Sequence, residues 1–253
     1  MKNNNDETGL SKVPELILIF WVIKIAATTL GETAGDAVSM SLNLGYLIGT
    51  AIFAAIFLVA VIIQIKAPRF HPVIYWATII ATTTVGTTLA DFADRSLGIG
   101  YAGGSSLLFA LLMGSLAIWH KSMGSISVDS VSNSKSEIFY WVTIMFSQTL
   151  GTALGDWTAD SAGFGYGGSA MIFGALLAVV VLLYFWTQIS RTFLFWAAFI
   201  LTRPLGAVVG DFLDKPIASG GLALSRFTAS AVLFAFILGC IFIFPHKAAK
   251  KAH

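Results

Sequence analysis

Acidic residues recur at regular spacing in this chain of 253 residues, in pairs whose members are three or four residues apart. One member of each pair is an aspartate that ends the pattern Gly-x-x-x-(Gly/Ala)-Asp. Helical residues three or four apart lie on one face, so the spacing predicts two carboxylates on a shared helical face. The pairs contain eight of the thirteen acids: Glu32, Asp36, Asp91, Asp94, Asp156, Asp160, Asp211 and Asp214.

The chemistry expected of such a cluster is the binding of hard cations and protons. Carboxylate oxygens suit Mn²⁺, Mg²⁺ and Ca²⁺, and like charges crowded in a low-dielectric site cannot all ionise. We therefore expect some of the eight acids to hold protons near neutral pH, and a divalent cation that displaced them would be exchanged for H⁺. The candidate metal ligands are the four motif aspartates, Asp36, Asp91, Asp156 and Asp211.

The composition is that of a membrane protein. Hydrophobic residues make up 57% of the chain and charged residues 11%, whereas soluble domains carry about 25% charged residues. The net charge of +2 is too small and scattered to indicate a nucleic-acid partner. Cys240 is the only cysteine and no two histidines have ligand spacing, which argues against a soft-metal site.

Eight segments are long and apolar enough to cross a bilayer, and each is predicted to be a helix because open sheet edges are not stable in lipid. At 1.5 Å per residue, Pro72 to Asp91 covers roughly 28 Å. The acids therefore lie either in a bundle interior or at the outer mouth, where water would solvate them. The predicted spans are 14–35, 44–65, 72–90, 102–120, 137–155, 167–187, 192–210 and 222–244.

Four repeats follow from the tryptophans Trp21, Trp76, Trp141 and Trp196. A glycine follows each tryptophan by ten residues and an aspartate by fifteen, within the stretches GETAGD, GTTLAD, GTALGD and GAVVGD. Small residues four apart let two helices approach closely. The predicted packing pairs are Gly31 and Gly35, Gly86 and Ala90, Gly151 and Gly155, and Gly206 and Gly210.

The repeat predicts the architecture. Each unit holds two spans, so consecutive units enter the membrane in the same direction, and four packed units can bury the polar stripe that one unit cannot. We expect an all-α integral membrane fold of eight transmembrane helices, forming four parallel helical hairpins around a pseudosymmetric axis. The expected parts are a cytoplasmic tail (1–13), repeats 1 and 2 (14–121), a cytoplasmic linker (122–136), repeats 3 and 4 (137–245) and a basic cytoplasmic tail (246–253).

Polar residues also lie inside the predicted spans. Lys24 and Arg203 are expected either to pair with carboxylates along a polar path or to extend to the inner interface. Arg203 lies seven residues after its tryptophan, a position that is polar in all four repeats. This polar layer is expected to line the polar path, unless its threonines hydrogen-bond to the backbone of their own helices. Its members are Thr28, Thr83, Gln148 and Arg203.

Three further expectations concern orientation and helix shape. Ten basic residues lie on one side of the membrane and three on the other, which predicts both termini in the cytoplasm. The outer three are Arg95, Lys215 and Arg226. Pro204 should kink or break its helix, and the repeat tryptophans are expected in an interfacial aromatic belt.

These units resemble a bacterial membrane-protein family built from four tandem two-helix "repeat of unknown function" units. The resemblance rests on the tandem period, the tryptophan of each first helix and the Gly-x-x-x-(Gly/Ala)-Asp motif, and it covers about residues 15–244. It implies a multi-pass protein of the bacterial inner membrane. It implies no activity, so the function is argued from the residues.

The residues favour a transporter that moves a hard divalent cation along a carboxylate-lined path, in exchange for protons, because the acids have few neighbours of opposite sign in the sequence. One alternative is export of an organic cation, which Trp157 and the outer tyrosines could stack against. Another is a membrane scaffold or sensor. An enzyme is not expected, because the Gly-x-Gly-Asp and Tyr-Asp motifs of intramembrane aspartyl proteases are both absent. The expected partners are the lipid bilayer and the small cation, with no cofactor and no nucleic acid.

Overall fold

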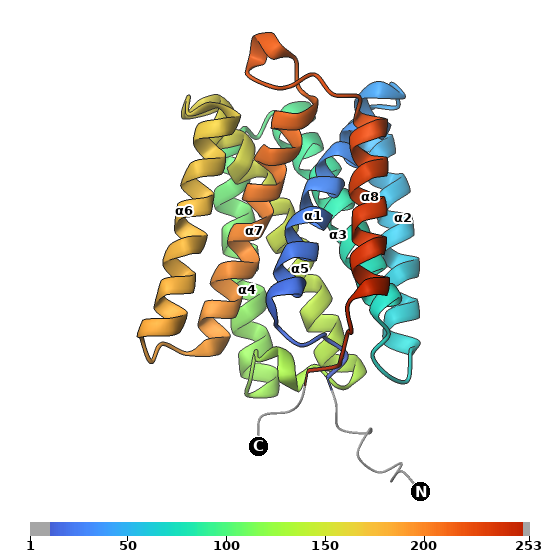
Figure 1. The fold of residues 1–253 in the computed structure, drawn as a ribbon, viewed down its shortest axis with the longest axis vertical. Coiled ribbons are helices and arrows are strands. Elements are labelled where there is room, and N and C mark those ends of the chain that lie inside the picture. The colour runs from blue at the N-terminus through green and yellow to red at the C-terminus, as the bar shows by residue number, and fades with distance from the viewer. Residues whose placement is uncertain (1–10, 250–253) are drawn as a thin grey trace, which may run out of the picture.

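A computed structural model describes residues 11–249, so the predicted terminal tails lie partly outside the described residues. Within that range the chain forms eight long α-helices and no β-strand. Figure 1 shows these helices running side by side along the long axis of the molecule. The helices are α1 (Leu18–Asp36), α2 (Gly45–Lys66), α3 (Pro72–Asp91), α4 (Tyr101–Met123), α5 (Ser134–Asp156), α6 (Gly165–Trp186), α7 (Arg191–Asp214) and α8 (Arg226–Ile243).

Seven of these eight described helices are long and apolar enough to cross a membrane, by length and composition. The exception is α5, which carries Lys135, Glu137, Gln148 and Asp156. The odd-numbered helices α1, α3 and α5 each continue into a five-residue π-helical turn, at Ala37–Ser41, Phe92–Ser96 and Trp157–Ser161. By contrast, α7 is followed by a loop with a short 3-10 turn at Ile217–Ser219.

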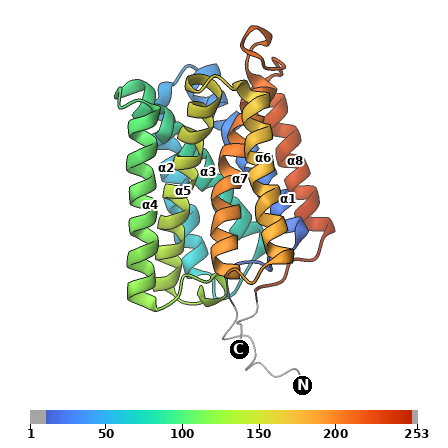
Figure 2. The same cartoon turned by 90° about the vertical axis from the view of Figure 1, so that its left-hand side faces the viewer.

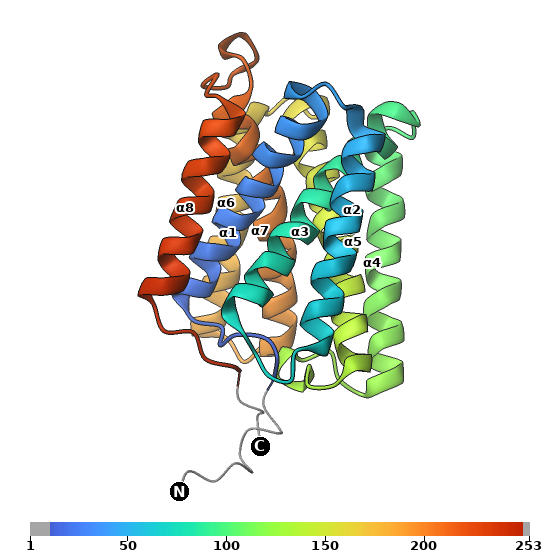
Figure 3. The same cartoon turned by 90° about the vertical axis from the view of Figure 1, so that its right-hand side faces the viewer.

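The helices form an inner ring and an outer layer. The first helices of the four repeats, α1, α3, α5 and α7, contact one another in that order, and α7 closes the ring on α1. Each outer helix packs on the inner helix of the next repeat: α2 on α3, α4 on α5, α6 on α7, and α8 on α1. Figures 2 and 3 show these outer helices on opposite sides of the bundle.

This packing differs from the hairpins expected within each repeat. The π-helical turn and the loop after it carry the chain away from its own inner helix. Only residues 67–71 separate α2 from α3, and such a short connection favours packing of the two helices it joins. The repeats are therefore interlocked rather than stacked as separate hairpins.

Burial divides the two layers sharply. In the apolar windows of α1, α3 and α7, 67–72% of the residues are buried inside the bundle, against 11–28% in α2, α4, α6 and α8. The exposed side chains of the outer helices are largely apolar, as at Leu47, Met171 and Val232. Most of the buried polar side chains of the described residues belong to the inner helices.

Of the kink or break expected at Pro204, the break does not occur. The helix α7 runs without interruption from Arg191 to Asp214. Gly151 of α5 lies directly against Arg203 and Pro204, so the neighbouring helix leaves room for the proline ring. Packing on a neighbour outweighs the local helix-breaking tendency of proline.

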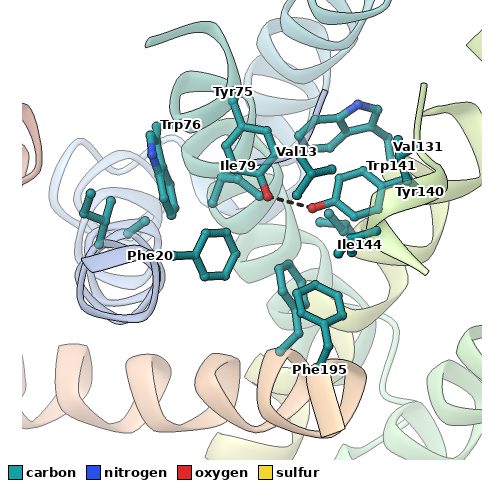
Figure 4. Close-up of a cluster of buried hydrophobic side chains, with 14 of the residues drawn as sticks. Val13, Phe20, Tyr75, Trp76, Ile79, Val131, Tyr140, Trp141, Ile144 and Phe195 are labelled. Carbon is teal, nitrogen blue, oxygen red and sulfur yellow. Dashed lines mark hydrogen bonds between the residues drawn. The ribbon is translucent and has the colours of Figure 1, made fainter. Parts of the chain in front are cut away.

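The repeat tryptophans are not an interfacial belt either. Trp76, Trp141 and Trp196 are buried near the N-terminal ends of the inner helices, in an aromatic cluster that also contains Tyr75 and Tyr140. Figure 4 shows Trp76 and Trp141 with the two tyrosines. The two tyrosine hydroxyls are hydrogen-bonded at 2.6 Å. Only Trp21 of the four repeat tryptophans is partly exposed. Helix packing decides this burial, because the four helices meet on the face that carries the rings. We call this side of the bundle the aromatic end.

Both described chain ends and the central linker close the aromatic end. Val13 is buried in the aromatic cluster, and the main chain beside it bonds to residues 247 and 249 near the C-terminus. The linker residues Val128 and Val131 are buried beside it. Lys12 forms an ion pair of 2.6 Å with Glu137 at the start of α5. Three distant parts of the chain are therefore joined beneath the rings.

Candidate functional site

Four aspartates meet where the inner helices end, on the side of the bundle opposite the aromatic cluster. At most 3% of each of these side chains is exposed. We call Asp36, Asp91, Asp156 and Asp211 the aspartate ring and this side the acidic end. Carboxyl oxygens lie within 4.8 Å of one another in three groups, Glu32–Asp36–Asp91, Glu32–Asp156–Asp211 and Asp36–Asp211–Asp214.

The small residues of the motif bring the ring together. The first glycine of each repeat receives the polar-layer residue of the next inner helix: Gly31 faces Thr83, Gly86 faces Gln148, Gly151 faces Arg203, and Gly206 faces Thr28. A Cβ atom on Gly86 would lie 3.0 Å from the Gln148 backbone. Larger side chains would therefore push the helices apart and separate the aspartates that follow.

The second small position of the motif makes the same type of contact. Gly35 faces Thr87, Gly155 faces Ala207, and Gly210 faces Glu32. Ala90 holds this position in the second repeat and is also buried. The contacts assign a packing role to the small residues predicted from the sequence, and the aspartate comes directly after them on the same helix.

Arg95 bridges the second and third repeats. Its Nε lies 3.1 Å from Asp91 four residues earlier, and its Nη2 lies 3.1 Å from Asp156. The guanidinium also donates to the hydroxyls of Tyr101 at 3.1 Å and Tyr46 at 3.2 Å. One arginine thus holds two ring carboxylates and two tyrosines.

Lys215 has the same repeat position as Arg95 and bridges the fourth and first repeats. Its Nζ lies 3.0 Å from Asp211, and it also forms an ion pair with Asp36. Burial alone would lower the pKa of Lys215, but the carboxylates of Asp211 and Asp36 outweigh burial and raise that pKa above its usual value. Lys215 therefore stays positively charged at neutral pH.

The remaining predicted acids have different surroundings. Asp214 binds Arg226 at 3.0 Å, and the same arginine lies 3.8 Å from Asp36. Asp94 is buried, but neither of its oxygens accepts a hydrogen bond from the described residues. Asp160 is exposed and stays outside the buried cluster.

Glu32 occupies the next layer toward the aromatic end, where it pairs with Arg203. Two guanidinium nitrogens lie 3.1 Å from one Glu32 oxygen. The same guanidinium donates to Thr87 at 2.6 Å and to Thr152. Arg203 is fully buried, so it pairs with a carboxylate rather than extending to an interface.

Lys24 does not pair with a carboxylate among the described residues. Its Nζ lies 3.5 Å from Gln148 and 4.2 Å from the centre of the Phe199 ring. Thr28 donates to backbone carbonyls, including that of Ile25 at 2.8 Å. Thr83 is fully buried, and its hydroxyl has no hydrogen-bond partner within residues 11–249. The polar layer is therefore buried in all four repeats, although its members make different contacts.

The expectation that the acids have few neighbours of opposite sign is wrong. Arg95, Lys215 and Arg226 all reach into the acidic cluster, although the sequence indicated them only as outer charges. The sequence does indicate a contact with the motif aspartate for Arg95 and Lys215, because each follows that aspartate by four residues. The contacts with the next repeat could not be read from that spacing.

Comparisons with known proteins agree with the internal repeat. A family model described as Repeat of Unknown Function (DUF347) matches residues 19–70, 74–125, 139–190 and 194–246. Each matched segment covers most of one inner helix and all of the outer helix that follows it. No curated protein and no solved structure shows significant similarity to the chain.

Proposed function

The chain belongs to the Repeat of Unknown Function (DUF347) family, and we propose that it is a multi-pass transporter of the inner membrane that exchanges a hard divalent cation for protons. In this proposal the eight helices span the bilayer as four parallel repeats around a pseudosymmetric axis. The exposed apolar side chains of the outer helices support this placement. Most buried polar and charged side chains belong to the inner helices, as expected for a polar path through a membrane.

The observation that carries the proposal is the excess of buried carboxyls. Seven of the predicted acids are buried at the acidic end, and four basic side chains contact them there. A buried carboxylate without a counter-charge is costly, so the surplus favours bound protons or a bound cation. The two groups that share Glu32 each offer three carboxylates to a hard cation.

Arg95 and Lys215 would act as tethered counter-ions in this exchange. Each bridges two ring aspartates from adjacent repeats and so neutralises part of the charge of the ring while these contacts persist. Arg95 is the more accessible of the two, with 29% of its side chain exposed against 11% for Lys215. We expect an entering cation to displace Arg95 first, while the aromatic cluster keeps the other end closed.

The test is uptake of Mn²⁺ by proteoliposomes. The wild-type protein should take up Mn²⁺ when an outward proton gradient is imposed, because protons leave the liposome as Mn²⁺ enters. Asp156→Asn should abolish this uptake because it removes a ring carboxylate. Asp160→Asn is the matched control, since Asp160 lies four residues away on the same repeat but is exposed. Uptake no faster than in empty liposomes, or uptake unchanged by Asp156→Asn, would contradict the proposal.

The proposed orientation has its own test. The two ends of the described chain, near residues 11 and 249, and the central linker lie at the aromatic end, which we assign to the cytoplasm. Reporter domains fused after residue 130 and at the C-terminus should therefore both report a cytoplasmic location. A periplasmic signal from either fusion would refute the N-in and C-in assignment.

A second candidate substrate is an organic cation, favoured by the surroundings of Arg95. Its guanidinium lies 5.9 Å from the Tyr46 ring centre and 6.0 Å from that of Tyr101, with two carboxylates beside it. Carboxylates and aromatic faces also recognise free guanidinium compounds. Methylguanidinium that is itself transported, while Mn²⁺ is not, would favour this candidate.

A further inference from the structure

An apolar groove of about 550 Å³ runs between α6, α7 and α1 at the aromatic end. Its walls are formed by aliphatic side chains such as Leu177, Val181, Ile25 and Ala198. The groove is separate from the acidic end, because none of its lining residues belongs to the aspartate ring. A molecule bound in this groove would therefore be distinct from the cation of the proposed transport.

The rim of the groove carries groups that suit a phosphate. Arg191 is the first residue of α7, and its guanidinium lies 4.3 Å from the centre of the Tyr184 ring. The N-terminus of this 24-residue helix adds a partial positive charge beside it. The Nη1 of Arg191 donates to the main-chain oxygen of Tyr184, and the rest of the guanidinium can donate a charge-assisted hydrogen bond to a phosphate oxygen. Asp129 also lines the groove and accepts a hydrogen bond from Ser127.

Trp21 indicates where this groove lies relative to the bilayer. It is the one repeat tryptophan that is partly exposed, and it lines the groove together with Tyr184. Tryptophan and tyrosine concentrate where headgroups meet the hydrocarbon core. Apolar walls below two such rings, with an arginine at the rim, match a lipid with its acyl chain in the groove and its phosphate at the surface.

We propose that this groove binds one anionic phospholipid, with an acyl chain between α6 and α1 and the phosphate on Arg191. The inference rests on the membrane placement proposed above, but not on transport. The terminal residues of the chain are poor alternative occupants, because the sequences MKNNNDETGL and KKAH are mainly polar. A phospholipid is at hand for this groove, since the surrounding bilayer supplies it.

The experiment measures lipid binding to the purified full-length protein in detergent by native mass spectrometry. The probes are phosphatidylglycerol and phosphatidylcholine with identical acyl chains. We expect the wild type to retain one phosphatidylglycerol and to bind it more tightly than phosphatidylcholine. Arg191→Gln should remove this preference through about tenfold weaker phosphatidylglycerol binding, the loss of one charge-assisted hydrogen bond.

A groove-filling pair of variants tests the acyl-chain site. Val181→Trp should abolish retention of both lipids, because Val181 lines the groove. Val179→Trp is the matched control, since Val179 is similarly exposed on α6 but does not line it. Both positions are about half exposed, so neither tryptophan has to enter the packed core.

Two results would overturn the proposal: retention of the lipid by Val181→Trp at the wild-type level, or an unchanged headgroup preference in Arg191→Gln. Equal loss of lipid in Val181→Trp and Val179→Trp would also overturn it. None of these measurements uses cation flux. A protein that moves no Mn²⁺ but retains the lipid would therefore contradict only the proposed transport.

Discussion

Replacing Arg203 by glutamine removes the cation from an ion pair that is almost completely buried. Arg203 has no exposed surface and Glu32 exposes only 3% of its side chain. Glutamine already occupies this repeat position in the third unit, at Gln148. The substitution therefore introduces a side chain that the repeat accommodates, and its main effect is electrostatic.

The expected cost follows from the contacts of the guanidinium. Arg203→Gln leaves Glu32 buried without its cation and removes the donor to Thr87 and Thr152. Removing one partner of a buried ion pair typically costs about 3 to 5 kcal/mol. We expect a decrease of that size in the free energy of unfolding. The exposed Lys121→Gln, as the control, should change it by less than about 0.5 kcal/mol.

A double-mutant cycle with Glu32→Gln separates the ion pair from other effects. Each single variant leaves one buried charge without its partner, whereas the double variant removes both charges. The double variant should therefore lose less stability than the sum of the single losses, by about 1 to 3 kcal/mol. Denaturant unfolding in detergent micelles, followed by circular dichroism, gives these free energies. Additive losses, or a loss below about 1 kcal/mol for Arg203→Gln, would refute the reasoning.

Three further outcomes are expected. Gly86→Val should prevent assembly of the inner ring, because the valine side chain would meet the Gln148 backbone. Gly114→Val on α4 should fold normally, since nothing lies within 4 Å of a Cβ atom placed there. Size-exclusion profiles and unfolding curves distinguish the two variants. Tyr75→Phe should cost about 1 kcal/mol of stability through loss of the hydrogen bond to Tyr140, and equal unfolding midpoints for variant and wild type would contradict this. Mn²⁺ affinity should rise from pH 5 to pH 8, as protons leave the carboxyl groups, with proton release in weakly buffered solution. Lys215 does not contribute to that change: its raised pKa keeps its stabilising charge fully present below the unfolded value of about 10.4, and the charge is lost only at higher pH. Affinity that is flat across the range would eliminate proton exchange.

The internal repeat explains how much of the fold could be predicted. A fixed interval from tryptophan to glycine to aspartate places equivalent residues at the same depth and on the same face of four helices. Burial of Asp36 and its three counterparts, and the close contacts of the glycines, follow from that regularity. The helical structure of the eight segments was also predictable, because these apolar segments are long and continuous.

The aromatic cluster shows why the depth of a tryptophan along its helix does not predict whether its ring faces lipid. The tryptophans lie near the ends of their helices, where an interfacial belt is the usual arrangement. Whether such a ring faces lipid or the bundle depends on the side from which the neighbouring helix approaches. Three of the four rings point inward in the folded chain.

The helical class, the four units, and the acids and small residues of each unit could all be read from the amino-acid sequence. Which charges neutralise one another depends instead on how the helices pack. Lys215 binds Asp36, which lies 179 residues away, and Arg203 binds Glu32 across 171 residues. Periodicity defines the face and depth of a side chain on its own helix, but the partner is set by the order in which helices pack. That order interlocks neighbouring repeats, so a counter-ion that looks like a loop charge in the sequence lies inside the carboxylate cluster of the fold.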